Sequence, residues 1–207
     1  MNPRIDYYFA PNSPWAYLGH ARFVSIARQA KAQVHVMPVD LGGKVFPISG
    51  GLPLRQRAPQ RQAYRLVELK RFSNYLGVPL NLKPKFFPVS TDDVAKLIVA
   101  IDLNQGTDAA LNITQAVLTA VWVDELNIAD MNILEGLLKK CGLAASLIEK
   151  TYSQAAQEAY EAYTQQAIDA GVFGAPSYVV DGEIFWGQDR LDFLERRVQS
   201  RTIIQSE

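Results

Sequence analysis

The alternation of apolar and polar residues near the N-terminus predicts a strand followed closely by a helix. Arg4–Phe9 is a short β-prone run, and Ala16–Ala30 carries apolar residues at helical spacing. Between them, Ser13 and Pro14 form a typical helix start, because serine caps the first turn and proline fits the first helical position. The sequence therefore predicts a helix whose N-terminus carries a hydroxyl group.

Near the C-terminus the pattern predicts a hairpin and a final helix. The β-prone runs Ser177–Val180 and Glu183–Trp186 flank Asp181-Gly182, a pair that favours a type I′ turn because both central residues need positive φ. Pro176 opens the first run, where its missing N–H is tolerated. A helix is expected over Asp189–Ile204, and all these elements together outline a thioredoxin-type sheet.

The long middle segment has helical periodicity and is expected to form an inserted domain. Helices are predicted over Arg61–Leu76, Val94–Ile101 with Thr91 as cap, Leu111–Glu125, Met131–Lys140 and Ala144–Ala170. Residues 55–170 would then form an all-α insertion in a discontinuous thioredoxin-like domain made of residues 1–54 and 171–207. Leu41–Pro59, with two glycine pairs and three prolines, is expected to be a long loop placed to cover Ser13.

Composition narrows the possible functions. Among the 207 residues, Lys+Arg and Asp+Glu both total 21, so the chain has no basic field to hold nucleic acid. No apolar run reaches the roughly 18 residues of a membrane span, and the polar N-terminus does not resemble a signal peptide. We therefore expect a cytoplasmic protein with no nucleic-acid or membrane partner.

The single cysteine and the two histidines offer little chemistry. Cys141 has no second cysteine to pair with, and its predicted position at a helix end disfavours a thiolate. His20 and His35 do not have metal-ligand spacing with it, so no metal site is expected. We interpret both histidines as surface or structural residues.

The helix start at Ser13 has a chemical reading beside the structural one. Unpaired N–H groups and the positive end of the helix dipole stabilise an anion there. Taken alone, the segment is more often a plain helix cap. Further motifs along the chain favour the chemical reading over the structural one. They are Ser13-Pro14-Trp15 with Tyr17 and Leu18; Leu41-Gly42-Gly43; Arg61 and Tyr64 before Gly77-Val78-Pro79; Trp122 with Asp130; Gly174-Ala175-Pro176; and Trp186-Gly187-Gln188-Asp189-Arg190.

With these motifs the chain resembles the DsbA-like thioredoxin-fold group that contains kappa-class glutathione transferases and 2-hydroxychromene-2-carboxylate isomerases. The resemblance implies an α/β fold, a DsbA-type sheet domain with a large all-α insertion. In that family the serine replaces the first cysteine of thioredoxins, and the proline equivalent to Pro176 is cis. One departure concerns glutathione binding: Gly51 stands where the family has an asparagine, whereas Arg61 stands at a family lysine.

The resemblance implies that glutathione is the cofactor and that Ser13 donates a hydrogen bond to its thiolate. The edge at Ala175 would pair with the cysteinyl backbone, and the helix start at Gly187 would hold the γ-glutamyl group, with Asp189 facing its ammonium. Glutathione contacts are expected from Asn12, Pro14, Trp15, Arg61, Ala175, Pro176, Gly187, Gln188, Asp189 and Arg190. Tyr17, Tyr64 and Phe87 are expected to wall a pocket for a small aromatic substrate.

Three functions fit these features. The first is a glutathione-dependent isomerase of a conjugated aryl-enone acid, in which the sulfur adds reversibly and permits rotation about the former double bond. The second is a transferase that conjugates electrophiles irreversibly. The third, from a different class, is a binding module without turnover. A homodimer is expected in each case.

Overall fold

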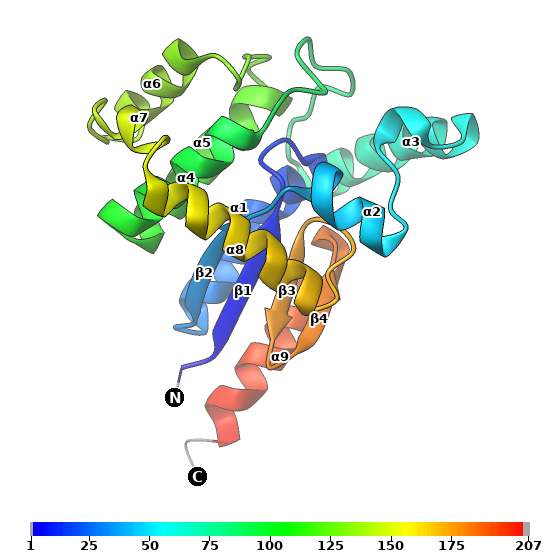
Figure 1. The fold of residues 1–207 in the computed structure, drawn as a ribbon. Coiled ribbons are helices and arrows are strands. Elements are labelled where there is room, and N and C mark those ends of the chain that lie inside the picture. The colour runs from blue at the N-terminus through cyan, green and yellow to red at the C-terminus, as the bar shows by residue number, and fades with distance from the viewer. Residues whose placement is uncertain (1, 205–207) are drawn as a thin grey trace.

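A four-stranded mixed sheet forms the centre of the computed structural model, which describes residues 2–204. The strand order is β2-β1-β3-β4 (Figure 1). The strands are β1 (Arg4–Phe9), β2 (Gln33–Pro38), β3 (Ser177–Val180) and β4 (Glu183–Trp186). β1 is parallel to β2 and antiparallel to β3, so the N-terminal and C-terminal parts of the chain share one sheet.

The predicted hairpin is confirmed. β3 and β4 pair antiparallel, with Val180 opposite Glu183. Asp181 and Gly182 have φ of 52° and 81°, the positive values that this turn needs.

Helices make up most of the remainder. They are α1 (Pro14–Gln29), the one-turn π-helix η1 (Leu41–Val45), α2 (Phe46–Ser49), the 3-10 turn η2 (Leu54–Gln56), α3 (Pro59–Leu76), α4 (Asp92–Gln105), α5 (Thr107–Trp122), α6 (Met131–Lys140), α7 (Leu147–Lys150), α8 (Gln154–Asp169), the 3-10 turn η3 (Gln188–Arg190) and α9 (Leu191–Ile204). No helix among the described residues is both long enough and apolar enough to cross a membrane.

Three local predictions were wrong. Ala144–Ala170 is not one helix, because Ser153 caps a new helix, α8, by accepting from the Ala156 N–H at 3.3 Å. Leu41–Pro59 is largely short helices, the first held by the Asp40 carboxylate, which accepts from the Gly43 N–H at 2.7 Å. The Thr91 side chain makes no capping bond to α4.

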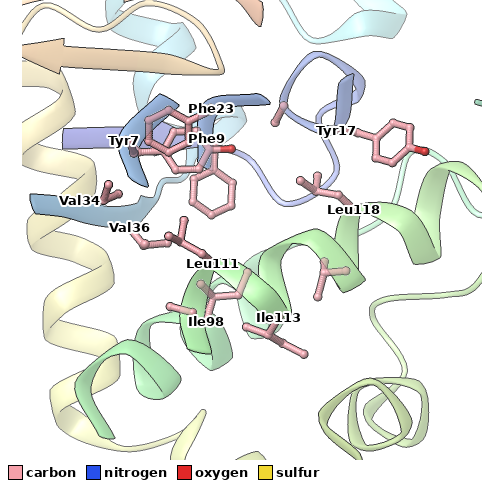
Figure 2. Packing of buried hydrophobic residues seen from close by; sticks show 14 of the residues in the cluster. Tyr7, Phe9, Tyr17, Phe23, Val34, Val36, Ile98, Leu111, Ile113 and Leu118 are labelled. Atoms are coloured by element: carbon pink, nitrogen blue, oxygen red, sulfur yellow. The ribbon is translucent and has the colours of Figure 1, made fainter. Parts of the chain in front are cut away.

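Alternating side chains of the sheet form two apolar layers. Ile5 and Tyr7 of β1 face α1 and α9 in the larger core, whereas Tyr8 faces Ala167 of α8 in a smaller one. Figure 1 shows α8 crossing one face of the sheet. In Figure 2, Tyr7 lies with Phe23 of α1, and their ring centroids are 4.6 Å apart.

The inserted helices pack directly on this sheet. α4 and α5 contact β2, and Figure 2 shows Val36 of β2 close to Leu111 of α5. Most of their buried apolar residues belong to the same core cluster as those of β1 and α1, whereas Ala95, Val99 and Ala100 of α4 pack with α8 in a separate cluster. The division into residues 1–54 with 171–207 and an inserted domain over residues 55–170 stays a prediction.

His20 is a buried structural residue that joins two helices. Its ring nitrogens lie 3.1 Å from the Tyr7 hydroxyl oxygen and 3.0 Å from the Leu111 carbonyl oxygen. Burial lowers its pKa to about 4, and the bond to Leu111 opposes the shift. α1 is therefore fixed against both the sheet and α5.

Candidate active site

Ser13 begins α1 in the geometry of a helix cap. Its φ and ψ are −75° and 123°, its Oγ accepts from the Ala16 N–H at 3.2 Å, and Pro14 follows in the first turn. The Ser13 hydroxyl donates to the Ala175 carbonyl across a long distance of 3.4 Å. Because that bond is near the limit of hydrogen bonding, the hydroxyl proton is held weakly by the protein.

Ala175 faces Ser13 from the segment that leads into β3. The Ala175-Pro176 peptide is cis, as the resemblance implies. Within the part of the chain that the structure describes, the Ala175 N–H makes no hydrogen bond, and its carbonyl accepts only the long bond from Ser13. A free backbone donor and a nearly free acceptor therefore stand beside the serine.

A cavity of about 830 Å³ opens between Ser13, Ala175 and the segment that follows β2. We call it the serine cavity. Its other lining residues include Asn12, Trp15, Phe46, Gly51, Arg57, Arg61, Arg65, Phe87, Pro88, Val89, Phe173 and Trp186. The volume lies in the range of small-molecule sites, roughly 300–1,000 Å³.

Phe46 explains the departure at Gly51. A Cβ atom added at Gly51 would stand 2.2 Å from Cδ1 of Phe46, so the ring occupies the space that a longer side chain would need. Asn12 is also engaged, because its Nδ2 donates to the Val89 carbonyl at 2.9 Å. The cavity wall at Gly51 thus carries an aromatic ring where the family pattern implies an asparagine side chain.

A second cavity of about 550 Å³ adjoins the first and shares Trp15, Arg57, Arg61, Arg65, Ala175 and Trp186 with it. We call it the adjoining cavity. Gly187, Gln188, Asp189 and Arg190 line it from the start of η3, and Tyr64 lines it from α3.

Close packing on α1 sets the position of η3. A Cβ atom at Gly19 would lie 2.8 Å from Cβ of Gln188, so only glycine lets η3 approach this closely. Arg22 donates to the Gln188 carbonyl. Arg190 Nη1 lies 2.6 Å from Asp189 Oδ2, so these neighbouring side chains form an ion pair.

Three arginines line both cavities from one side of α3 and its approach. Arg57, Arg61 and Arg65 have no carboxylate oxygen of residues 2–204 within 4.0 Å. Burial lowers the pKa of Arg57, and the neighbouring Arg61 lowers it further. This wall is suited to anionic ligands.

The structure brings together most of the predicted site. Asn12, Ser13, Pro14, Trp15, Arg61, Ala175 and Phe87 line the serine cavity, while Tyr64, Gly187, Gln188, Asp189 and Arg190 line the adjoining cavity. Tyr17 lines neither, because it is buried and donates to the Pro79 carbonyl at 2.6 Å. Pro176 is also buried outside both, and its carbonyl accepts from the Gly187 N–H at 2.9 Å.

Sequence reasoning missed several lining residues. Arg65 stands four residues after Arg61, a spacing that places two residues on one face of the predicted helix and was available as a signal. Arg57 precedes α3 and has an extended backbone, so helical spacing gave no signal for it. Trp186 was part of the quoted motif but was not assigned to the site. Phe46 gave no signal, because its position depends on the fold of the short helices around it.

Cysteine chemistry is remote from both cavities. Cys141 ends α6 and lines neither of them. Burial raises the pKa of its thiol, although Lys140 acts in the opposite sense. Within residues 2–204, no group of three His, Cys, Asp or Glu side chains is placed to hold a metal ion.

The fold and this site define a thioredoxin-fold protein of the DsbA type in which a serine begins the first helix, at the wall of a cavity. Comparison with known proteins agrees, since residues 4–199 match the family model of the DSBA-like thioredoxin domain. The chain belongs to this family.

Named relatives narrow its place in the family. The chain is 32% identical over 196 residues to a 2-hydroxychromene-2-carboxylate isomerase of Sphingobium xenophagum, covering 94% of this chain and 97% of the relative. It is 24% identical to glutathione S-transferase kappa 1 of Caenorhabditis elegans, covering 95% and 91%. A solved 2-hydroxychromene-2-carboxylate isomerase structure superposes with a TM-score of 0.79 at 27% identity, covering 98% and 97%.

Proposed function

We propose that the protein is a glutathione-dependent isomerase of a conjugated aryl-enone acid, of the type that converts 2-hydroxychromene-2-carboxylate to trans-o-hydroxybenzylidenepyruvate. The observation that carries the proposal is the placement of Ser13 at the start of a helix, on the wall of a large cavity and beside the unpaired backbone of Ala175. No cysteine lines either cavity among the described residues. A thiol brought there meets a hydrogen-bond donor and the positive end of a helix.

The residues present fit glutathione on several observations. The unpaired N–H of Ala175 and its nearly free carbonyl can accept a short peptide as an added strand. Arg61, without a carboxylate partner, can take a glutathione carboxylate. The start of η3 at Gly187 and the Asp189 carboxylate suit the γ-glutamyl end, since both line the adjoining cavity.

Bound glutathione would supply a thiolate for reversible addition to the enone, which would permit rotation about the former double bond. Ser13 turns its weakly held proton from the Ala175 carbonyl to the sulfur and so stabilises the charged form. The N–H groups at the start of α1 act in the same sense. Ser13 is a donor throughout and forms no covalent bond.

Aromatic residues of the two cavities suit a flat substrate. Phe87 and Trp15 line the serine cavity, and Tyr64 lines the adjoining cavity with 58% of its surface exposed. Rings of this kind pack against an aryl group while the helix start holds the thiolate. Tyr17, which lines neither cavity, has no place in this pocket.

A kappa-class-like transferase is the second candidate, favoured by the relative from C. elegans. It uses the same glutathione site and differs in the fate of the adduct, which leaves as product. A binding module without turnover is the third candidate, and it predicts ligand binding with no reaction.

Glutathione titration by calorimetry, followed by parallel assays with an aryl-enone acid and a generic electrophile such as a chlorodinitrobenzene, separates the three. We expect glutathione to bind and the aryl-enone acid to isomerise without net consumption of thiol. Net thiol consumption with both substrates favours the transferase, and binding without either reaction favours the module. Absence of glutathione binding at millimolar concentration contradicts both enzymes.

A cytoplasmic homodimer is part of the same proposal. Val67 and Tyr75 of α3 support an interface, because they are large apolar residues with 48% and 81% of their surface exposed. Light scattering coupled to size-exclusion chromatography tests the assembly, and a monomeric mass contradicts it.

A further inference from the structure

Two cations that line both cavities, Arg57 and Arg65, are used neither by the motifs nor by the proposed glutathione contacts. Arg57 Nε already donates to the Leu52 carbonyl at 2.8 Å. Arg65 lies on α3, one turn after Arg61. Its guanidinium carbon stands 5.2 Å from the ring centroid of Phe87 and 5.8 Å from that of Trp122. The guanidinium is therefore held against an aromatic wall.

This guanidinium lacks a counter-ion. Its Nη2 is buried without a hydrogen-bond acceptor, and no carboxylate oxygen of the described residues lies within 4.0 Å. By contrast, Arg71 on the same helix is paired with Glu68. A buried donor on a charged group is costly unless something pairs with it, so the arrangement calls for an anion.

Burial, followed by the neighbouring charge of Arg57, lowers the pKa of the Arg65 guanidinium to about 10. The group still carries its charge at neutral pH. An anion in contact with the guanidinium would offset part of the cost of burying its charge.

The position of Phe87 indicates from which side the anion comes. Phe87 lines the serine cavity but not the adjoining cavity, where Gly187 and Asp189 lie. The segment that carries Phe87 is anchored to the end of α5, since the Asn81 N–H donates to the Trp122 carbonyl at 2.8 Å. A ligand that meets both Phe87 and Arg65 thus occupies the serine cavity, with an aromatic part and a carboxylate close together.

We propose that Arg65 binds the carboxylate of the aryl-enone acid and selects acids over neutral enones. This inference rests on the proposed function, because it assigns the second substrate of the same site. Arg61 then binds a carboxylate of glutathione, and Arg65 binds the carboxylate of the substrate. A planar guanidinium meets a carboxylate through two parallel bonds, which fixes the orientation of the substrate as well as its charge.

The direct test measures binding of saturated analogues that cannot add a thiol. The pair is 4-(2-hydroxyphenyl)-2-oxobutanoate and the neutral ketone in which a methyl group replaces the carboxylate. Calorimetry on the glutathione-loaded protein should show the acid binding about tenfold to a hundredfold more tightly than the ketone, the range for a hydrogen-bonded charged pair. Arg65→Met should abolish this preference and leave ketone affinity within about twofold.

Lys70→Met is the matched control, since Lys70 is an exposed cation on the same helix and lines neither cavity. It should retain the preference for the acid. Arg65→Lys keeps the charge but not the planar guanidinium, so it should retain only part of the preference for the acid. This variant tests the proposal if Arg65→Met does not fold. With the unsaturated acid, Arg65→Met should raise KM by a similar factor.

Two results would overturn the assignment: equal affinity of the wild-type protein for acid and ketone, or an acid preference that survives in Arg65→Met. The assignment is also overturned if the wild-type protein does not bind the acid at all. Titration with glutathione alone distinguishes these outcomes from failure of the proposed function, because Arg65→Met should bind glutathione as the wild-type protein does. Loss of glutathione binding in that variant would reassign Arg65 to glutathione.

Discussion

Replacing Ser13 with alanine separates the structural and chemical parts of the helix start. The variant loses two bonds: the acceptor bond from the Ala16 N–H at 3.2 Å and the long donor bond to the Ala175 carbonyl at 3.4 Å. Loss of a serine cap destabilises a protein by about 1 kcal/mol, which lowers Tm by roughly 2–4 °C at this chain length. We therefore expect Ser13→Ala to fold.

The effect on chemistry should be larger. A hydrogen bond to a charged group contributes about 1.5–3 kcal/mol, and 1.36 kcal/mol corresponds to one pKa unit. Without the hydroxyl, the pKa of the bound glutathione thiol should rise by roughly 1–2 units. Where the thiolate limits the rate, turnover at neutral pH should fall about tenfold to a hundredfold.

Ser153 provides the matched control. It caps α8 in the same way, accepting from the Ala156 N–H at 3.3 Å and donating to the Lys150 carbonyl at 2.8 Å, but it lines neither cavity. Ser153→Ala should lose similar stability and keep full activity. Ultraviolet titration of the bound thiolate, thermal unfolding and turnover are measured on all three proteins. A wild-type thiol pKa or full turnover in Ser13→Ala would refute the donor role.

Three further predictions concern stability and the position of η3. Because the pKa of His20 is lowered from 6.5 to about 4, the unfolded chain binds the proton first as pH falls, and up to about 3 kcal/mol of stability should be lost between these pH values. His20→Gln should remove this component from a series of urea titrations across pH, and an unchanged pH profile would contradict it. Gly19→Ala places a Cβ atom 2.8 Å from Cβ of Gln188, which should displace η3 and cost about 1–3 kcal/mol of stability. Calorimetry should then show weaker glutathione binding. Unchanged affinity would argue against close packing as the cause of the η3 position. Gly136→Ala adds a Cβ in open space within α6 and should stabilise the protein by about 0.5–1 kcal/mol in urea unfolding, whereas destabilisation would contradict the helix geometry.

Elements with strong local signals were predictable from the sequence. Arg4–Phe9 and Ser177–Val180 are strands with the predicted bounds, because β-prone residues and turn residues agree there. The break at Ser153 was missed because the alanine-rich sequence around it favours helix on both sides, and a cap is a weaker signal than propensity summed over many residues. Tyr17 was misplaced for a related reason, since spacing identifies a helix but not which of its aromatic residues faces a cavity.

The site was predictable as far as its motifs extend. Each of the main site motifs has a local geometry that its residue types favour: Ser13 caps a helix, Ala175 precedes a cis proline, and Gly187 begins η3. The structure brings these three positions to the two adjoining cavities. The contact between Arg65 and Phe87 was not predictable, because Phe87 lies in a segment between Gly77 and Thr91 without regular secondary structure. The path of such a segment follows tertiary contacts rather than periodicity.

The serine at the start of α1 changes what the same geometry can do. A cysteine at this position can form a disulfide, so its reactivity ends in exchange of electrons with a partner. A hydroxyl forms no disulfide, so in the proposed function the helix start and the free edge at Ala175 hold a thiolate that the ligand brings. The proposed ligands also require the site to bind further negative charge, because glutathione carries carboxylates and an aryl-enone acid adds another. On this proposal the arginines of α3 without carboxylate partners bind that charge, so the absence of a protein thiol at position 13 and the positive wall of the cavities are two parts of one arrangement.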